Sequence, residues 1–489
     1  MTRAAASWRC ARAAVILAGC TVGPAYHRPG APLPASGVYK EGAWKVASPA
    51  DEIPRGRWWT MFREPELDAL EARLNITNQT IVQAFENYLA ACAQIRAARA
   101  QYFPTVTAAP SATLSRGSGA FTRGAATTTP GTTATTPGTT ATPTPTGTSG
   151  GRNTIYALPV EVSWAPDLFG RVRSTVRQRQ YAAQASAADL ESTRLLAQAT
   201  VAQTYFELRG QDALQELLDA TVQADEQILA LTRSRYELGI GAEVEVVQAQ
   251  LTLQTARVQA TNAAILRAED EHAIATLLGV PASGFTLPRR TLHAEPPVIP
   301  AGTPSQLLER RPDIAAAERN MAAANARIGV AQAAYFPALT LSGSGGFAST
   351  SLATLFDPAS RFWSLGANLA GTLLDFGGRA AAVDTARAQY DESVATYRQA
   401  VLVAFQEVED NLAASRWYAE ETKVQEDATR AARESVLLTG NQYRAGTVSL
   451  LNLIVAQAAQ LNAERDMMTL LGRRLTAQVA LIRAIGGSW

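Results

Sequence analysis

Residues 331–337 read Ala-Gln-Ala-Ala-Tyr-Phe-Pro and repeat an earlier stretch, residues 97–104, which reads Ala-Ala-Arg-Ala-Gln-Tyr-Phe-Pro. In each stretch an alanine-rich segment, which favours helix, runs into a proline, and an extended polar and apolar segment follows. Tyr335 follows Tyr102 by 233 residues. Because the same helix-to-strand transition occurs twice, the sequence predicts one structural unit that is repeated within the chain.

Further matches share a second spacing of 207 residues. They pair Phe169-Gly170 with Phe376-Gly377, Tyr236 with Tyr443, and Gly239 with Gly446. The two spacings differ by 26 residues (233 − 207), close to the length of a run rich in Thr, Pro, Gly and Ala at about residues 124–151. Such a run has no large apolar side chain to bury and predicts an exposed loop inserted into the first copy.

Alternating polar and apolar residues predict two strand hairpins. The expected strands cover residues 105–115, 155–164, 338–347 and 363–374. A segment of about ten residues in which polar and apolar side chains alternate has the length and pattern of a transmembrane β-strand. A soluble two-layer sheet is the alternative. Four strands cannot close a barrel alone, so a membrane barrel would need several copies of the chain.

Long helices are expected after each hairpin. Between Arg171 and about Tyr236 there is no proline, and the segment from about residue 380 to 443 is equally uninterrupted. A helix of roughly 65 residues would be about 100 Å long. Apolar or small residues at alternating spacings of three and four predict a coiled-coil seam in the first of these helices. That seam comprises Leu214, Leu217, Thr221, Ala224, Ile228 and Leu231.

The first residues have the pattern of a secretory signal, with arginines, the apolar run 13–18 and a small residue before Cys20. Leu17-Ala18-Gly19-Cys20 also resembles the bacterial lipobox, which implies a signal peptide at 1–19, a covalent lipid on Cys20 and a lipid-anchored linker over 20–62. An ordinary signal with a chance cysteine is the alternative. Thr21 stands where an inner-membrane retention signal would usually have Asp, so the resemblance implies onward sorting to the outer membrane. Cys92 would then be the one free thiol, and no intrachain disulfide is expected.

Composition disfavours two other classes of protein. The chain has 44 basic and 43 acidic residues, so it lacks the charge excess that nucleic acid would require. Its three histidines lack metal-ligand spacing, and no nucleophile elbow is present. We therefore expect no enzyme, no metal site and no cofactor apart from the lipid. No stretch after the signal approaches the roughly 20 apolar residues of a transmembrane helix.

Several motifs along the mature chain belong to one pattern. They are Cys20-Thr21-Val22-Gly23-Pro24 with Tyr26 and Pro29, Trp58-Trp59 with Phe62, Pro65, Leu67 and Leu70, residues 307–314 (Leu-Leu-Glu-Arg-Arg-Pro-Asp-Ile), both Tyr-Phe-Pro segments, and residues 486–489 (Gly-Gly-Ser-Trp). Together they resemble outer-membrane efflux proteins of the TolC/OprM type, in the NodT-like lipoprotein branch.

The resemblance implies an α+β membrane protein. Its fold would combine a long α-helical coiled-coil barrel in the periplasm with a transmembrane β-barrel of four strands per chain, completed by a homotrimer and built on an internal two-fold repeat. The first repeat would cover 63–290, a connector 291–303 and the second repeat 304–489. The implied partners are a periplasmic membrane-fusion adaptor, an inner-membrane RND-type pump and outer-membrane lipid. The implied function is a passive conduit for drugs or other small molecules; a coiled-coil tether or adhesin is the alternative.

The helix–turn–helix tips, residues 236–241 and 443–447, are the candidate site. Glycine allows the chain to reverse there, and the resemblance makes Gly239, Gly241, Gly446 and Thr447 candidate adaptor contacts.

The spacing of 207 pairs Glu245 with Asn452 and Gln248 with Val455, at one level of the pore mouth. Relatives often carry carboxylates at such positions, and only Glu245 fits that pattern. Leu451 lies where related channels are closed by leucine side chains, so an apolar constriction is expected. Solvated charge for Glu245 and coiled-coil packing for Leu451 are the alternatives.

Overall fold

The computed structural model describes residues 22–30, 38–39, 42–43, 56–116, 152–290, 296–297 and 310–487. The expected lipidation at Cys20, the signal segment, the loop at 124–151 and most of the connector 291–303 lie outside these residues. The chain divides into two compact units. The strand unit comprises Met1–Pro24, Arg96–Val176 and Ala326–Thr385, and the helical unit comprises Ala25–Ile95, Arg177–Asn325 and Ala386–Trp489.

The principal helices occur in two sets of matching length. The first set is α3 (Gln79–Ala100), α4 (Arg171–Glu237) and α5 (Glu243–Leu277), and the second is α7 (Pro312–Ala333), α8 (Gly378–Arg444) and α9 (Leu450–Ala484). In each set the lengths are 22, 67 and 35 residues. Starts and ends of matching helices are separated by the spacings of 233 and 207 residues read from the sequence. The helix bounds therefore follow the repeat that the motifs predict.

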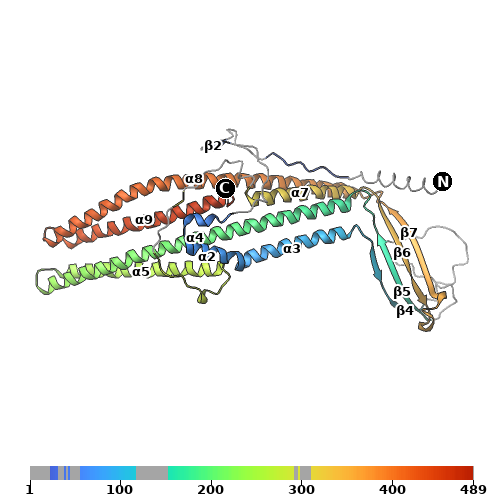
Figure 1. Ribbon diagram of the computed structural model, residues 1–489, viewed down its shortest axis with the longest axis horizontal. Helices are drawn as coiled ribbons and strands as arrows, with labels where there is room; N and C mark the ends of the chain where they lie inside the picture. The colour runs from blue at the N-terminus through green and yellow to red at the C-terminus, as the bar shows by residue number, and fades with distance from the viewer. Residues whose placement is uncertain are drawn as a thin grey trace. The chain divides into compact units, whose positions relative to one another are not determined.

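An antiparallel sheet forms the centre of the strand unit, where Figure 1 shows β4 to β7 side by side. Its members are β3 (Thr105–Ala108), β4 (Ser111–Arg116), β5 (Arg152–Trp164), β6 (Ala338–Ser349) and β7 (Arg361–Ala370). The order is β3-β5-β6-β7, and β4 also pairs with β5.

The prediction of a single strand over 105–115 is wrong in one respect, because the structure divides this segment into β3 and β4. The division falls at Ala109 and Pro110, and proline has no N–H to donate to the ladder. The register continues through the break, since Ala108 faces Val160 and Ser111 faces Ala157. The strand expected over 363–374 also differs, since it begins at Arg361 and ends at Ala370.

The expected coiled-coil seam on α4 is displaced by one residue. Leu231 of the predicted seam is 46% exposed, whereas its neighbour Thr232 is 1% exposed. The face buried within the chain includes Gln215, Leu218, Asp225, Leu229 and Thr232. Three of these are polar, so apolar spacing alone points to the adjacent positions. The Thr232 hydroxyl is satisfied locally by donating to the carbonyl oxygens of Ile228 and Leu229, both at 3.0 Å.

The largest apolar core of the helical unit lies where the N-terminal segment meets α4. The short helix η1 (Trp58–Phe62) inserts Trp58, Trp59 and Phe62, each less than 7% exposed. The rings of Phe62 and Phe206 have centroids 4.9 Å apart. The helix α2 (Pro65–Thr77) adds Leu67, which is fully buried. This packing fixes the start of α2 against the middle of α4.

None of the helices in the described parts of the chain combines the length and the hydropathy that a membrane span requires.

Candidate functional site

The chain forms two helical hairpins, α4–α5 and α8–α9. The turn of each helical hairpin contains a glycine in the left-handed region of φ. Gly239 has φ of 72° and Gly446 has φ of 75°. The N–H of Gly239 donates to the carbonyl of Tyr236 at 2.9 Å, and the N–H of Gly446 donates to the carbonyl of Tyr443 at 3.0 Å. A side chain at either glycine would be strained by this φ. These two glycines therefore end the long helices, as the matching Tyr-x-x-Gly spacing predicts.

The other two candidate tip residues stabilise the turns in different ways. A Cβ added at Gly241 would lie 3.2 Å from the Cβ of Arg235, so the backbone approaches the end of α4 closely. The Thr447 hydroxyl donates to the carbonyl of Gln442 at 3.0 Å. In the first turn, between α4 and α5, Leu238 is 74% exposed and Ile240 is 67% exposed. The first turn thus presents two large apolar side chains that nothing in the described chain covers.

Above the turns, the two hairpins pack on each other through one apolar cluster. Its buried members come from all four helices: Leu229, Ala249, Leu253, Tyr443, Leu450 and Leu453. Tyr443 is 3% exposed, whereas its repeat partner Tyr236 is 47% exposed. The repeat is therefore unequal at this level, because the second hairpin supplies the buried tyrosine.

Tyr443 brings a cation and an acid together. The guanidinium carbon of Arg235 lies 5.0 Å from the centre of the Tyr443 ring, within range of a cation–π interaction. Burial raises the pKa of Tyr443, the Arg235 charge opposes that shift, and the negative charge of Glu245 adds to it. Glu245 is half-buried and lies in the first turn of α5, where the helix dipole favours an acid. The structure therefore places Glu245 within electrostatic range of Tyr443.

The remaining gate candidates lie on an uncovered face of α9. Leu451 is 53% exposed and Val455 is 62% exposed, and they are one turn apart. Asn452 is also exposed. The residues that pack within the chain are Leu450 and Leu453, at 1% and 6% exposure. Leu451 is therefore only partly covered within the chain, and an apolar face remains available for another molecule.

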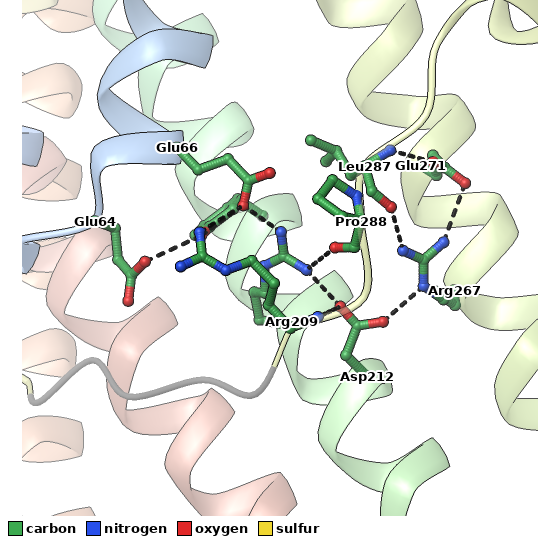
Figure 2. A network of polar contacts seen from close by, with 10 residues as sticks. Glu64, Glu66, Arg209, Asp212, Arg267, Glu271, Leu287 and Pro288 are labelled. Carbon is green, nitrogen blue, oxygen red and sulfur yellow. Dashed lines mark hydrogen bonds and ion pairs between the residues drawn. The ribbon is translucent and has the colours of Figure 1, made fainter.

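The base of the first hairpin is held by a buried ionic network that sequence analysis did not find. Arg209 of α4 is 1% exposed and pairs with Glu66 of α2. The same guanidinium donates to Asp212 at 2.5 Å and to the carbonyl of Pro288 at 2.9 Å. Figure 2 shows Arg209 between Glu66 on one side and Asp212 with Pro288 on the other. One side chain thus joins α2, α4 and the segment that follows α5.

A second arginine extends this network to α5. Arg267 donates to Asp212 at 2.6 Å and to the carbonyl of Leu287 at 2.7 Å. It also pairs with Glu271 at 3.1 Å, and Glu271 accepts from the Leu287 N–H at 2.5 Å (Figure 2). Asp212 is therefore shared by two arginines, which offsets the cost of burying its charge.

At the repeat-related positions of the second hairpin, the described residues do not form the same network. The residues 207 positions after Arg209, Asp212, Arg267 and Glu271 are Arg416, Ala419, Arg474 and Gln478. Both acids are replaced, and Gln478 donates instead to the Ser415 hydroxyl at 2.7 Å. In the described residues no group of three or more His, Cys, Asp or Glu side chains could hold a metal ion. The buried ionic network at the base of the first helical hairpin is thus a structural difference between the two repeats.

Comparisons with known proteins agree on one family. Residues 70–280 and 303–487 match the family model described as outer membrane efflux protein. The chain is 32% identical to a probable efflux pump outer membrane protein, TtgC, of Pseudomonas putida, over 97% of this chain and 94% of that protein. It is 30% identical to the outer membrane protein OprJ of Pseudomonas aeruginosa, over 97% and 94% of the two chains.

Solved structures show the same fold. The outer-membrane channel OprN superposes with a TM-score of 0.80 at 28% identity, covering 96% of this chain and all of that one. The open state of the MtrE outer membrane channel of Neisseria gonorrhoeae superposes with a TM-score of 0.77 at 25% identity, covering 96% and 98% of the two chains. The long helices, the sheet and the paired hairpin turns therefore have counterparts in channel structures.

Proposed function

The chain belongs to the outer membrane efflux protein family, and from that premise we propose that three copies form the exit duct of a tripartite efflux system. The chain is the outer-membrane channel component, and it belongs to a transport family rather than to an enzyme family. The observation that carries this function is the match over 96% of the chain to the channel OprN.

Exposed apolar surface on the hairpins supports assembly into a homotrimer. On α5, Val244, Val247, Leu251 and Val258 are each more than half exposed and follow heptad spacing. A monomer with such a stripe in water would lose the free energy that burial provides. The sheet supports assembly too, because β3, β4 and β7 each present an edge to pair with another copy. Three copies would close one transmembrane barrel and one helical cylinder.

The proposed gate lies on the uncovered face of α9. Three copies of Leu451 and Val455 form an apolar ring, with Asn452 as a second, amide ring. Glu245 acts less directly, because it is half-buried and its charge acts on the Tyr443 hydroxyl. An apolar constriction of this kind excludes water and ions while it is closed.

Replacing Leu451 with serine tests the gate. We expect Leu451→Ser to widen the resting pore and to lower, by several-fold, the vancomycin concentration that inhibits growth. The control is Val424→Ser, which makes a similar apolar-to-polar change at a 65% exposed position on α8. Unchanged vancomycin susceptibility of Leu451→Ser, with normal protein level and normal drug export, would count against a gate at Leu451.

The turns supply the contact for a periplasmic membrane-fusion adaptor, which couples the channel to an RND-type pump. Gly239, Gly241, Gly446 and Thr447 shape these turns, and exposed Leu238 and Ile240 provide the apolar surface that a helical adaptor hairpin would cover. The cargo is a drug or another small molecule. A lipid on Cys20 would anchor the chain to the outer membrane, and mass spectrometry of the mature N-terminus would test it.

The channel itself is tested by purification from outer membranes, sizing in detergent and conductance in planar bilayers. The expected result is a trimer with stepwise single-channel conductance. A monomer without conductance would contradict the proposed function.

A further inference from the structure

Charged residues are rare in the five-stranded sheet, and most of them are arginines. Strands β3 to β7 contain one acid, Glu161, and three bases, Arg116, Arg152 and Arg361. Arg116 ends β4, Arg152 begins β5 and Arg361 begins β7, so all three lie at the end of the sheet away from the helices. We call these three residues the arginine rim.

The ladder places the arginine rim on the apolar face of the sheet. Leu158 faces Phe347, and Phe347 faces Arg361, so these three residues share one face. Successive residues of a strand alternate between the faces, so Arg152, six positions before Leu158 on β5, belongs to that face, as does Arg116 opposite it. The exposed large apolar side chains of the strands all lie on the same face: Val106, Leu114, Val160, Val162, Trp164, Trp363, Leu365 and Leu369.

Two like charges meet directly at one point of the rim. Arg116 and Arg152 are opposite each other in the ladder, an arrangement that destabilises a sheet. The one acid of the five strands, Glu161, is three positions from Leu158 and lies on the opposite face. Among the described residues neither Arg116 nor Arg361 has an ion pair. An anion supplied from outside the chain would remove this repulsion.

Arg361 lies at the level where a membrane has its headgroups. Strand β7 has 10 residues, the length that a tilted strand needs to cross the hydrocarbon core, and Arg361 is its first residue. The guanidinium carbon lies 5.8 Å from the ring centre of Phe347, within range of a cation–π interaction. The ring of Phe356, which is 67% exposed, has its centre 5.5 Å from that of Phe347. Aromatic rings gather at membrane interfaces, and the guanidinium fork fits a phosphate bidentately.

The arginines of the rim lie at two levels along the strands. Leu158 is level with Arg361 across the ladders, and Arg152 with Arg116 lies six residues further along β5. Six residues of a strand span about 20 Å. A phospholipid carries its phosphate at one level, beside the acyl chains. A glycolipid that carries phosphates on its acylated sugars and again on an attached oligosaccharide presents anions at both levels.

We propose that the arginine rim binds the phosphorylated glycolipid of the outer leaflet. Arg361 binds a phosphate beside the acyl chains, and Arg116 with Arg152 binds anionic groups on the core sugars. This inference rests on the proposed function, because the closed barrel turns the apolar face towards lipid and the loop end of the sheet towards the cell surface. It adds a lipid-binding site to the channel and names the residues and the ligand chemistry.

Lipid binding to the purified protein in non-ionic detergent tests the two levels, with bound lipid counted by native mass spectrometry across a titration. The probes are lipid A with both phosphates, and lipopolysaccharide with a phosphorylated inner core. We expect Arg361→Gln to weaken binding of both probes by about ten-fold, the loss of one bidentate phosphate contact. Arg116→Gln is expected to weaken binding of the core-bearing probe by a similar factor and to leave lipid A binding unchanged.

Two controls separate the rim from general charge effects. Arg430→Gln removes one positive charge from a 74% exposed side chain of α8 and should change neither affinity. Arg361→Lys should lose less than Arg361→Gln, since an ammonium retains the charge without the planar fork. Lipid A without its phosphates tests the parent protein with no substitution, and it should bind about ten-fold more weakly than intact lipid A.

Several outcomes would overturn the arginine rim. They are equal binding of lipid A with and without phosphates, equal binding of phosphatidylglycerol and lipopolysaccharide, displacement of the lipid by inorganic phosphate at matched concentration, and equal losses for Arg361→Gln and Arg430→Gln. Any of these, in a trimer that conducts, would leave the proposed function standing. A monomer without conductance would contradict the proposed function and the rim with it.

Discussion

Replacing Arg209 with methionine is expected to cost about 3–5 kcal/mol of the free energy of unfolding, the usual result of removing one partner from a buried ion pair. The Arg209 side chain is 1% exposed, and Asp212 is 2% exposed. Without the guanidinium, Asp212 keeps Arg267 and a 3.3 Å bond from the Arg290 N–H, and the Pro288 carbonyl loses its donor. Glu66 keeps a 3.5 Å bond from the Tyr205 hydroxyl and a 4.0 Å contact with Arg290. Methionine fills similar volume, so the loss comes mainly from the unpaired polar groups.

The measurement is the denaturant midpoint in detergent, followed by tryptophan fluorescence. The repeat supplies a matched control, Arg416→Met, because Arg416 occupies the equivalent position and is exposed beside Trp417. That variant is expected to lose less than about 1 kcal/mol, as surface charges usually do. Arg209→Lys should fall between them, since an ammonium retains the charge but not the planar fork. Equal losses for Arg209→Met and Arg416→Met would contradict a stabilising role for the network.

The helix bounds were predictable because they depend on local sequence. Proline-free stretches and turn glycines determine α4 and α8, and the repeat transfers each bound to the other half. The strand break at Pro110 was missed because the pattern of side-chain polarity continues through it. Only the backbone donor is absent, and a polarity pattern does not record donors.

Side-chain pairing was the part that sequence could not provide. Arg209 and Glu66 are 143 residues apart in sequence, and nothing near either residue specifies the other. The α4 seam was misplaced for a related reason: Gln215 and Asp225 are buried through tertiary packing that their polarity argues against. The same displacement separates buried Leu450 from exposed Leu451. A one-residue shift on a helix turns a side chain by about 100°, so register errors decide whether a residue faces a core or a pore.

The buried acid Glu71 should make the protein less stable as the pH rises. Its side chain in α2 is fully buried, and neither carboxylate oxygen has a hydrogen-bond partner in the structure. Burial raises the pKa of Glu71 well above its usual value, and the nearby charge of Asp68 adds to the shift. The folded state therefore holds this proton more tightly than the unfolded state does.

The sign follows from proton linkage. Below about pH 4.5 the acid is protonated in both states, and its contribution to stability is fully present. As the pH rises towards the folded pKa, only the unfolded chain releases the proton, and stability falls by about 1.4 kcal/mol per pH unit. Glu71→Gln keeps the shape of the neutral acid without a titrating proton. It should match the parent near pH 4 and exceed it in denaturant midpoint at pH 8.

The control for this prediction is Glu426→Gln, which removes an exposed carboxylate on α8 and should give no comparable gain at pH 8. A gain for Glu71→Gln of equal size at pH 4 and pH 8 would mean that the amide improves packing and that the proton is irrelevant. A loss at both values would mean that the carboxyl group has a partner that glutamine cannot replace. Only a gain that grows with pH fits a carboxyl group kept neutral by burial beside Asp68, because only then does ionisation of the unfolded chain compete with folding.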